Sequence, residues 1–241
     1  MPQMLQLYLA HDRCGWLDPS GVGNWHEDED FDGRLAQFLE AAAQAWPRRA
    51  LRGRPVKVWT SGGLIRPFLL GPVAGLNGST EICSFAQSQV SDATGWIQPC
   101  EVRVEGDVTK GVALATAMPA AEHERVEAAV KRAKLRLLSL RPWWAAVLDQ
   151  ALAVRPELEL LAVEDTESLV LLATQGGNWS MAETFAPRPS ADEAIRVVQR
   201  MAAGASVQPE RSAWWRWDAE MPNVGNALWP AARPSPFEGR S

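Results

Sequence analysis

The sequence predicts an α/β fold in which helices pack on mixed sheets, and three observations support this. Residues 156–185 contain three apolar runs separated by the polar corners 164–167 and 175–178, the pattern of a three-stranded antiparallel meander. An amphipathic helix follows at 190–202, with Ser190 as its expected N-cap. Strands, a helix and a further strand also recur before and after about residue 134.

The N-terminal third is expected to hold one strand, one long loop and one helix. Residues 4–10 alternate well enough for a strand, and residues 11–32 carry glycine, proline and acids, which is typical of a loop. An apolar stripe then predicts a helix over 33–46, capped by Asp30 or Asp32.

The middle of the chain predicts a hairpin followed by alternating strands and helices. Residues 56–60 and 64–70 flank Ser61-Gly62-Gly63, so we expect a hairpin, with Pro67 placing its second strand at an edge or a bulge. The later elements are expected to be a helix at 79–93, strands at 100–105 and 111–117, a helix at 119–133, a strand at 135–140 and a helix from 142. A short strand at 205–207 and a Trp-rich segment at 212–218 are expected after them.

Composition excludes several classes of function. The net charge of −5 argues against nucleic-acid binding, which needs a clustered basic surface. No apolar run approaches the length that spans a bilayer, and the N-terminus lacks the features of a signal peptide, so we expect a cytoplasmic protein without a transmembrane segment. The 3 cysteines are an odd number at wide spacing, which indicates reduced thiols.

No pattern of residues predicts a catalytic centre or a metal site. Histidines and acids gather in residues 11–32, but without the spacing of a zinc protease or a calcium loop, and a solvated acidic loop accounts for them. The glycine pairs at 62–63 and 176–177 lack the lysine and hydroxyl of a phosphate loop, so hairpin turns account for them better. Cys83 falls on an apolar helix face and is expected to pack there.

Tryptophan is the unusual residue, present 12 times against a single tyrosine. Trp143 and Trp144 begin a helix and point about 100° apart, so one can face the core while the other lines a groove or meets a partner. Core packing of both is the alternative. The candidates for contact with a protein partner are Trp143, Trp144, Trp214, Trp215 and Trp217.

Three segments resemble a known family. VWTSGGLIRPFLLGPVAGL from residue 58, LRLLSLRPWWAAVL from 135 and ELLAVEDTESLVLLA from 159 are similar to the actin-like cytoplasmic proteins of bacterial envelope machines, namely the type IV pilus assembly protein PilM and the cytoplasmic region of the type II secretion protein GspL. The resemblance covers about residues 54–203. It implies an actin-like (ribonuclease H-like) fold of two related lobes, with residues 1–133 in the first, 134–210 in a shortened second and 211–241 in an extended tail.

The resemblance also points to one candidate site. Relatives that bind ATP hold its phosphates on glycine-rich strand turns, because only glycine lets backbone N–H groups come so close. Asp165 matches the metal-facing aspartate of such a turn, but Glu167 stands where a glycine is needed and brings a negative charge toward the phosphates. The N-terminal strand offers His11-Asp12-Arg13-Cys14-Gly15, again without the compact pattern.

These departures lead to an expected function. The chain is expected to be a non-catalytic scaffold with a degenerate nucleotide pocket, without cofactor or metal, that binds protein components of an inner-membrane pilus or secretion assembly. The alternative is a working ATPase, in which Asp165 would lie near magnesium.

Overall fold

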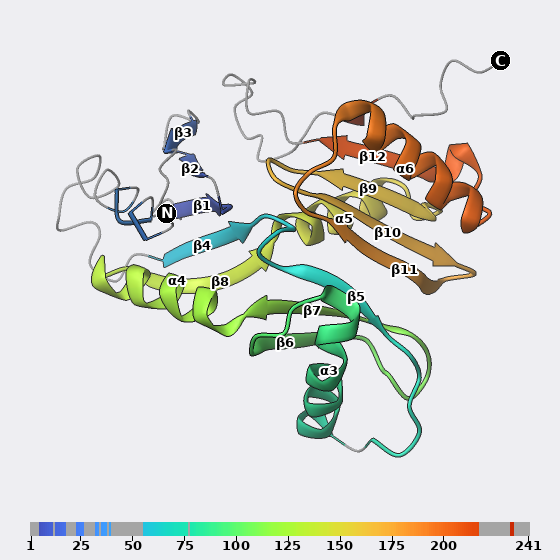
Figure 1. Ribbon diagram of the computed structural model, residues 1–241, viewed down its shortest axis with the longest axis horizontal. Coiled ribbons are helices and arrows are strands. Elements are labelled where there is room, and N and C mark those ends of the chain that lie inside the picture. The colour runs from blue at the N-terminus through green and yellow to red at the C-terminus, as the bar shows by residue number, and fades with distance from the viewer. Residues whose placement is uncertain are drawn as a thin grey trace.

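The computed structural model describes residues 5–11, 13–17, 23–26, 32–33, 35–37, 39, 55–76, 78–216 and 232–233. Within these ranges the strands form two five-stranded sheets and one three-stranded sheet (Figure 1). We call the parts built on the two large sheets the first and the second lobe.

The sheet of the first lobe has the order β3-β2-β1-β4-β8. Its strands are β1 (Leu5–Leu9), β2 (Cys14–Leu17), β3 (Gly23–His26), β4 (Pro55–Thr60) and β8 (Arg136–Pro142). Strands β1, β4 and β8 are parallel, and β2 and β3 add antiparallel to the edge of β1. The long loop predicted at 11–32 is therefore wrong where β2 and β3 lie. The alternation of apolar and polar residues that indicates a strand could not be recognised here, because each of these strands has only four residues.

Helix α4 (Ala120–Arg132) covers one face of this sheet. Its buried residues Val126, Ala129 and Val130 pack with the apolar side chains of β1 and β4. Leu35 and Leu39 of the helix predicted at 33–46 are buried in the same core, and most of that predicted helix lies outside the described residues.

The second sheet has the order β11-β10-β9-β12-β13, and its first three strands confirm the predicted meander. Its strands are β9 (Leu160–Glu164), β10 (Leu169–Gln175), β11 (Asn178–Phe185), β12 (Ser212–Arg216) and β13 (Ala232–Arg233). Strand β12 runs parallel to β9. The continuous apolar run of β9 is explained by burial on both faces, since helices cover each side.

Two helices sandwich this second sheet. Leu160 and Ala162 of β9 pack with the buried face of α6 (Ala191–Gly204). Leu161 and Val163, which point to the opposite face, pack with α5 (Trp143–Val154). Helix α5 is in contact with β8 as well as β9, so it ties the two lobes into one core.

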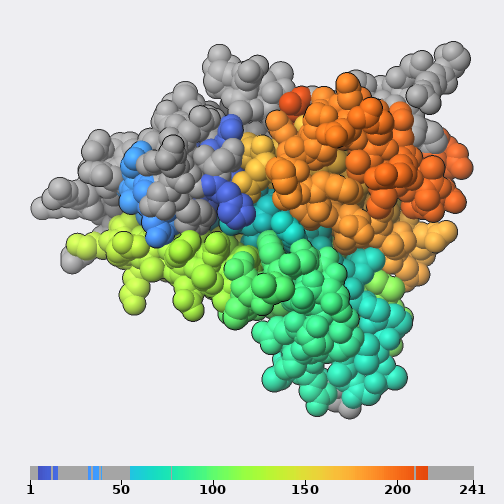
Figure 2. Space-filling model, in the orientation of Figure 1, coloured from blue at the N-terminus to red at the C-terminus, as the bar shows by residue number. Residues whose placement is uncertain are grey.

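The third sheet, of order β5-β7-β6, carries α3 (Ser79–Thr94) and protrudes from the rest of the molecule (Figure 2). Its strands are β5 (Arg66–Leu70), β6 (Cys100–Glu105) and β7 (Ala113–Pro119). The hairpin predicted from β4 to β5 is wrong: β4 is paired on both edges, with β1 and β8, so β5 pairs instead with β7. Pro67 does lie on an edge strand, as predicted.

Strand pairing also moves the predicted lobe boundaries. Strand β8 lies beyond the predicted boundary at 134, yet it completes the first sheet. Strand β12 lies in the predicted tail, yet it pairs with β9 inside the second sheet. Residues 205–207, predicted as a strand, form the turn that ends α6. In the part of the chain that is described, no helix has the length and apolar character needed to cross a bilayer.

Three of the five tryptophans proposed as partner contacts are buried. Trp143 and Trp144 are 0% and 1% exposed, and Trp214 is 3% exposed, so these side chains pack in the core, and a direct contact role is wrong for Trp143 and Trp214. The ring of Trp143 meets Trp59 of β4 edge to face at a centroid distance of 6.5 Å. Trp215 is only partly buried, and Trp217 lies outside the described residues.

Truncating Trp143 tests the role of α5 as the layer between the lobes. We expect Trp143→Ala to lower the free energy of unfolding by about 4 kcal/mol, because it leaves a large cavity at the centre of the fold. The measurement is equilibrium denaturation in urea. Leu152→Ala, in the same helix but 37% exposed, is the control and should cost about 1 kcal/mol or less. Equal losses for the two variants would contradict this central role.

Candidate functional site

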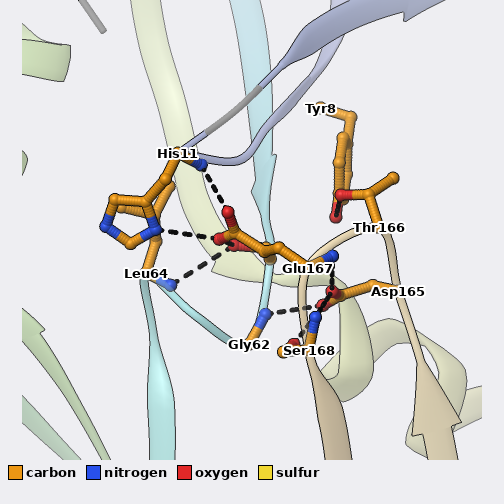
Figure 3. Close-up of polar contacts among 9 residues, drawn as sticks. Tyr8, His11, Gly62, Leu64, Asp165, Thr166, Glu167 and Ser168 are labelled. Atoms are coloured by element: carbon orange, nitrogen blue, oxygen red, sulfur yellow. Dashed lines mark hydrogen bonds and ion pairs between the residues drawn. The ribbon is translucent and has the colours of Figure 1, made fainter. Parts of the chain in front are cut away.

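The candidate site is the contact between the corner that joins β9 to β10 and two turns of the first lobe (Figure 3). We call it the interlobe corner and define it by His11, Ser61, Gly62, Asp165, Glu167 and Ser168. His11 follows β1, Ser61 and Gly62 follow β4, and the other three residues lie between β9 and β10. The structure therefore brings the predicted Asp165, Glu167 and His11 together.

The carboxylate of Asp165 is fully buried and accepts four hydrogen bonds from the protein. Its Oδ1 accepts from the backbone N–H groups of Glu167 (3.0 Å) and Ser168 (2.7 Å). Its Oδ2 accepts from the hydroxyl of Ser168 at 2.8 Å and, across the lobes, from the N–H of Gly62 at 2.7 Å. Burial raises the pKa of Asp165 to about 6, although these hydrogen bonds favour the charged form.

The carboxylate of Glu167 receives donors from two separate turns of the first lobe. The backbone N–H of His11 donates to Oε2 at 2.8 Å, and the Nδ1 of the same ring lies 2.9 Å from Oε1. The hydroxyl of Ser61 donates to Oε1 as well. Burial raises the pKa of Glu167, but the hydrogen bonds and charge of His11 and the Ser61 hydroxyl outweigh it, so this pKa lies below its ordinary value.

Two glycines let the lobes approach this closely. A Cβ atom at Gly62 would lie 2.6 Å from the Ser168 hydroxyl oxygen and would overlap Val170. A Cβ at Gly63 would overlap the carboxylate of Glu167. These glycines were interpreted as a hairpin turn, but the structure shows that they make room for side chains of the second lobe, namely Val170, Ser168 and Glu167.

Sequence reasoning missed Ser61, Gly62 and Tyr8 as part of this site. Tyr8 is buried beneath the corner, with its hydroxyl 3.1 Å from that of Thr166. Burial and the charge of Asp165 raise the pKa of Tyr8 well above its usual value. The adjacent glycines were the one signal in the sequence that could have pointed here.

The chemistry that this arrangement allows is limited. Ser61, Glu167 and His11 do not form a nucleophilic relay, because the carboxylate lies between the hydroxyl and the imidazole. Among the described residues, no group of three or more His, Cys, Asp or Glu side chains could hold a metal ion. The donors that could bind an external anion here are already paired with carboxylates of the chain.

A second feature is a cavity of about 150 Å³ between the protruding sheet and the first lobe. Its lining includes strands β6, β7 and β8 and the start of α5. Apolar side chains such as Met118 and Leu140 lie beside charged ones such as Arg103 and Arg141. Trp144, which the sequence suggested could line a groove, is one of its walls and donates its indole N–H to the carbonyl of Ile65 at 3.0 Å.

Comparison with solved structures identifies the fold as actin-like, as the sequence predicted. No protein-family model matches the sequence, and no match was found among curated proteins. The structure is similar to the cytoplasmic domain of EpsL, an inner-membrane component of the type II secretion system of Vibrio cholerae (TM-score 0.55, 13% identity, 90% of this chain and 83% of that one covered).

Two further solved structures are similar. A Bacteroides thetaiotaomicron protein with an actin-like ATPase fold has a TM-score of 0.56 at 10% identity, with 90% of this chain and 83% of that one covered. The PilM–PilN type IV pilus biogenesis complex has a TM-score of 0.52 at 13% identity, with 85% and 66% covered.

The raised pKa of Asp165 predicts a pH-dependent stability. Because the folded chain binds this proton more tightly than the unfolded one, the contribution of Asp165 is largest below the ordinary pKa near 3.8 and is lost as pH rises through about 6. Lowering the pH from about 7.5 to about 4.5 should therefore stabilise the wild type relative to Asp165→Asn by about 2 kcal/mol. Urea denaturation of both proteins across this range measures it.

Asp107→Asn is the matched control for that experiment. Hydrogen bonds from Thr109 and Lys110 lower the pKa of this exposed carboxyl to about 2, so its contribution is lost only at pH values below this range, and the stability difference between wild type and Asp107→Asn should stay nearly constant from about pH 7.5 to about 4.5. A stability difference between wild type and Asp165→Asn that stays constant with pH would contradict the prediction.

Proposed function

We propose that the chain is a non-catalytic, protein-binding component of a pilus or secretion-type assembly, in which the nucleotide pocket of the actin-like fold has become a contact between the lobes. The observation that carries this proposal is the position of Glu167, whose carboxylate takes up donors of both first-lobe turns. The names of two structural neighbours, a type II secretion component and a pilus biogenesis complex, support the setting.

Electrostatics favours an empty pocket over a bound nucleotide. A triphosphate placed at the corner would face the carboxylates of Glu167 and Asp165. It would also have to displace Glu167 from His11 and Ser61, and Asp165 from the N–H of Gly62. Like charges at short range and lost charge-assisted hydrogen bonds both oppose binding.

The cavity beside Trp144 is the surface that best fits a protein partner. Two strands that end their sheets, β6 and β8, contribute to its lining. An edge strand offers unpaired backbone groups with which an extended segment of a partner can pair. The apolar and charged side chains that line the cavity would make this binding specific for one segment. We propose that a segment of an inner-membrane assembly component binds here and holds the chain at the cytoplasmic face of the membrane.

The alternative function is that of an ATPase, and the position of Asp165 favours it. The resemblance matches this aspartate to the metal-facing aspartate of ATP-binding relatives, and one structural neighbour is described as having an actin-like ATPase fold.

Calorimetry with ATP and magnesium separates the two functions. We expect the wild type to give no magnesium-dependent binding heat at millimolar ATP, because Glu167 blocks the phosphates at the site where Asp165 would face the metal. Glu167→Gly removes both the charge and the bulk of the side chain and should gain measurable binding. The matched control is Glu167→Gln, which removes the charge but keeps the bulk of the side chain. This variant should not bind ATP. Tight, magnesium-dependent binding of ATP by the wild type would favour the ATPase.

Photo-crosslinking in the native cell tests the partner. A photoreactive residue in place of Arg103, at the cavity, should give an adduct that mass spectrometry identifies as an inner-membrane component of a pilus or secretion assembly. The control is the same residue in place of Arg200, on the exposed side of α6. Identical adducts from both positions, or adducts that contain no such component, would contradict the proposed docking surface.

A further inference from the structure

Two arginines of the second lobe converge on one buried acid. Glu164 is the last residue of β9, and its side chain is 2% exposed. Arg216, its partner residue on the parallel strand β12, places Nε 3.5 Å from Glu164 Oε1. Arg188, from the segment after β11, places an amino group 3.8 Å from the same oxygen. The two guanidinium groups therefore lie beside each other.

The N–H groups of this pair are only partly used. At 3.8 Å and 3.5 Å, both arginines are ion-pair partners of Glu164 rather than hydrogen-bond donors to it. Arg188 donates one hydrogen bond, to the carbonyl of Asp165 at 3.1 Å. Within the described residues, the buried atoms Arg216 Nε and Glu164 Oε2 have no hydrogen-bond partner. Most guanidinium donors of the pair therefore remain free for another acceptor.

The local charge balance favours an anion. Two positive groups share one carboxylate, and both arginine side chains remain about 30% exposed, at 32% and 29%. The neighbouring acids Asp165 and Glu167 direct their carboxylates to the first lobe, where Gly62 and His11 hold them. Ligands of open α/β sheets bind beyond the carboxyl ends of parallel strands, and Glu164 and Arg216 end β9 and β12.

We propose that Arg188 and Arg216, held in place by the buried carboxylate of Glu164, form a binding site for a phosphate-type oxyanion. The planar guanidinium fork suits two oxygens of such an anion, and two forks side by side can hold three or four. The anion is either free phosphate or the phosphate of a small metabolite such as a nucleotide. This site is independent of the β6–β8 cavity and of the Glu167 contact.

The test is calorimetric titration of the full chain with inorganic phosphate and, separately, with ATP without magnesium. The wild type should bind phosphate saturably at millimolar concentration. Arg188→Gln and Arg216→Gln should each weaken binding about tenfold, the effect of losing a charge-assisted hydrogen bond. Arg200→Gln removes an exposed arginine of α6 that lies in neither proposed site and should leave the affinity unchanged.

Comparison of the phosphate and ATP titrations, in the wild type and in the variants, decides the outcome. Tighter binding of ATP than of phosphate, lost in the Arg188→Gln variant, assigns the site to a phosphorylated metabolite, whereas equal affinities assign it to free phosphate. If a glutamine variant fails to fold, Arg188→Lys with Arg216→Lys keeps the charges over Glu164, loses the forks and should still bind less tightly. No saturable binding by the wild type, or affinity unchanged in the folded variants, would overturn the proposal.

Discussion

The contact of Glu167 with the first lobe is the interaction on which the rest of the site depends. Its carboxylate accepts from the backbone of His11 and from the Ser61 hydroxyl, which lie on two different turns. These hydrogen bonds join the β9–β10 corner of the second lobe directly to the first lobe. This close contact between the lobes also requires Gly62 and Gly63, because a Cβ atom at either position would overlap side chains of the second lobe. Glu167 and the two glycines therefore act together, because the glycines leave the space that the side chains of the second lobe occupy.

The packing of α5 makes this contact possible. Helix α5 lies between the two large sheets and carries Trp143 and Trp144 in its first turn, both fully buried. The indole N–H of Trp144 bonds the carbonyl of Ile65, next to the turn that begins at Ser61, and Trp143 packs on Trp59 just before that turn. The position of the glycine turn is therefore set by the core of the molecule, and the second lobe meets it at a fixed distance.

Local periodicity allowed the sequence to predict the meander at 158–185 and the helices α3, α4, α5 and α6. The actin-like fold was predicted from the resemblance of three segments to a known family. The sequence did not allow us to predict which distant segments pair as strands. The prediction of a β4–β5 hairpin was wrong because β1 and β8 pair with the two edges of β4. No residue pattern within 55–70 indicates that these two strands are its partners. At the site, the resemblance led us to expect a glycine where Glu167 stands, but the donors to that acid, His11 and Ser61, lie 156 and 106 residues away and could not be predicted.

Strand alternation explains why neighbouring acids of one corner have different roles. Successive side chains of a strand point to opposite faces, so Glu164 at the end of β9 faces Arg188 and Arg216, whereas Asp165 beyond it faces Gly62. The corner then turns, and Glu167 joins Asp165 on the side of the first lobe. A single acidic segment thus contacts the first lobe with two of its carboxylates and holds an arginine pair with the third. Because Arg188 also donates a hydrogen bond to the backbone carbonyl of Asp165, the arginine pair is anchored to the same corner that contacts the first lobe.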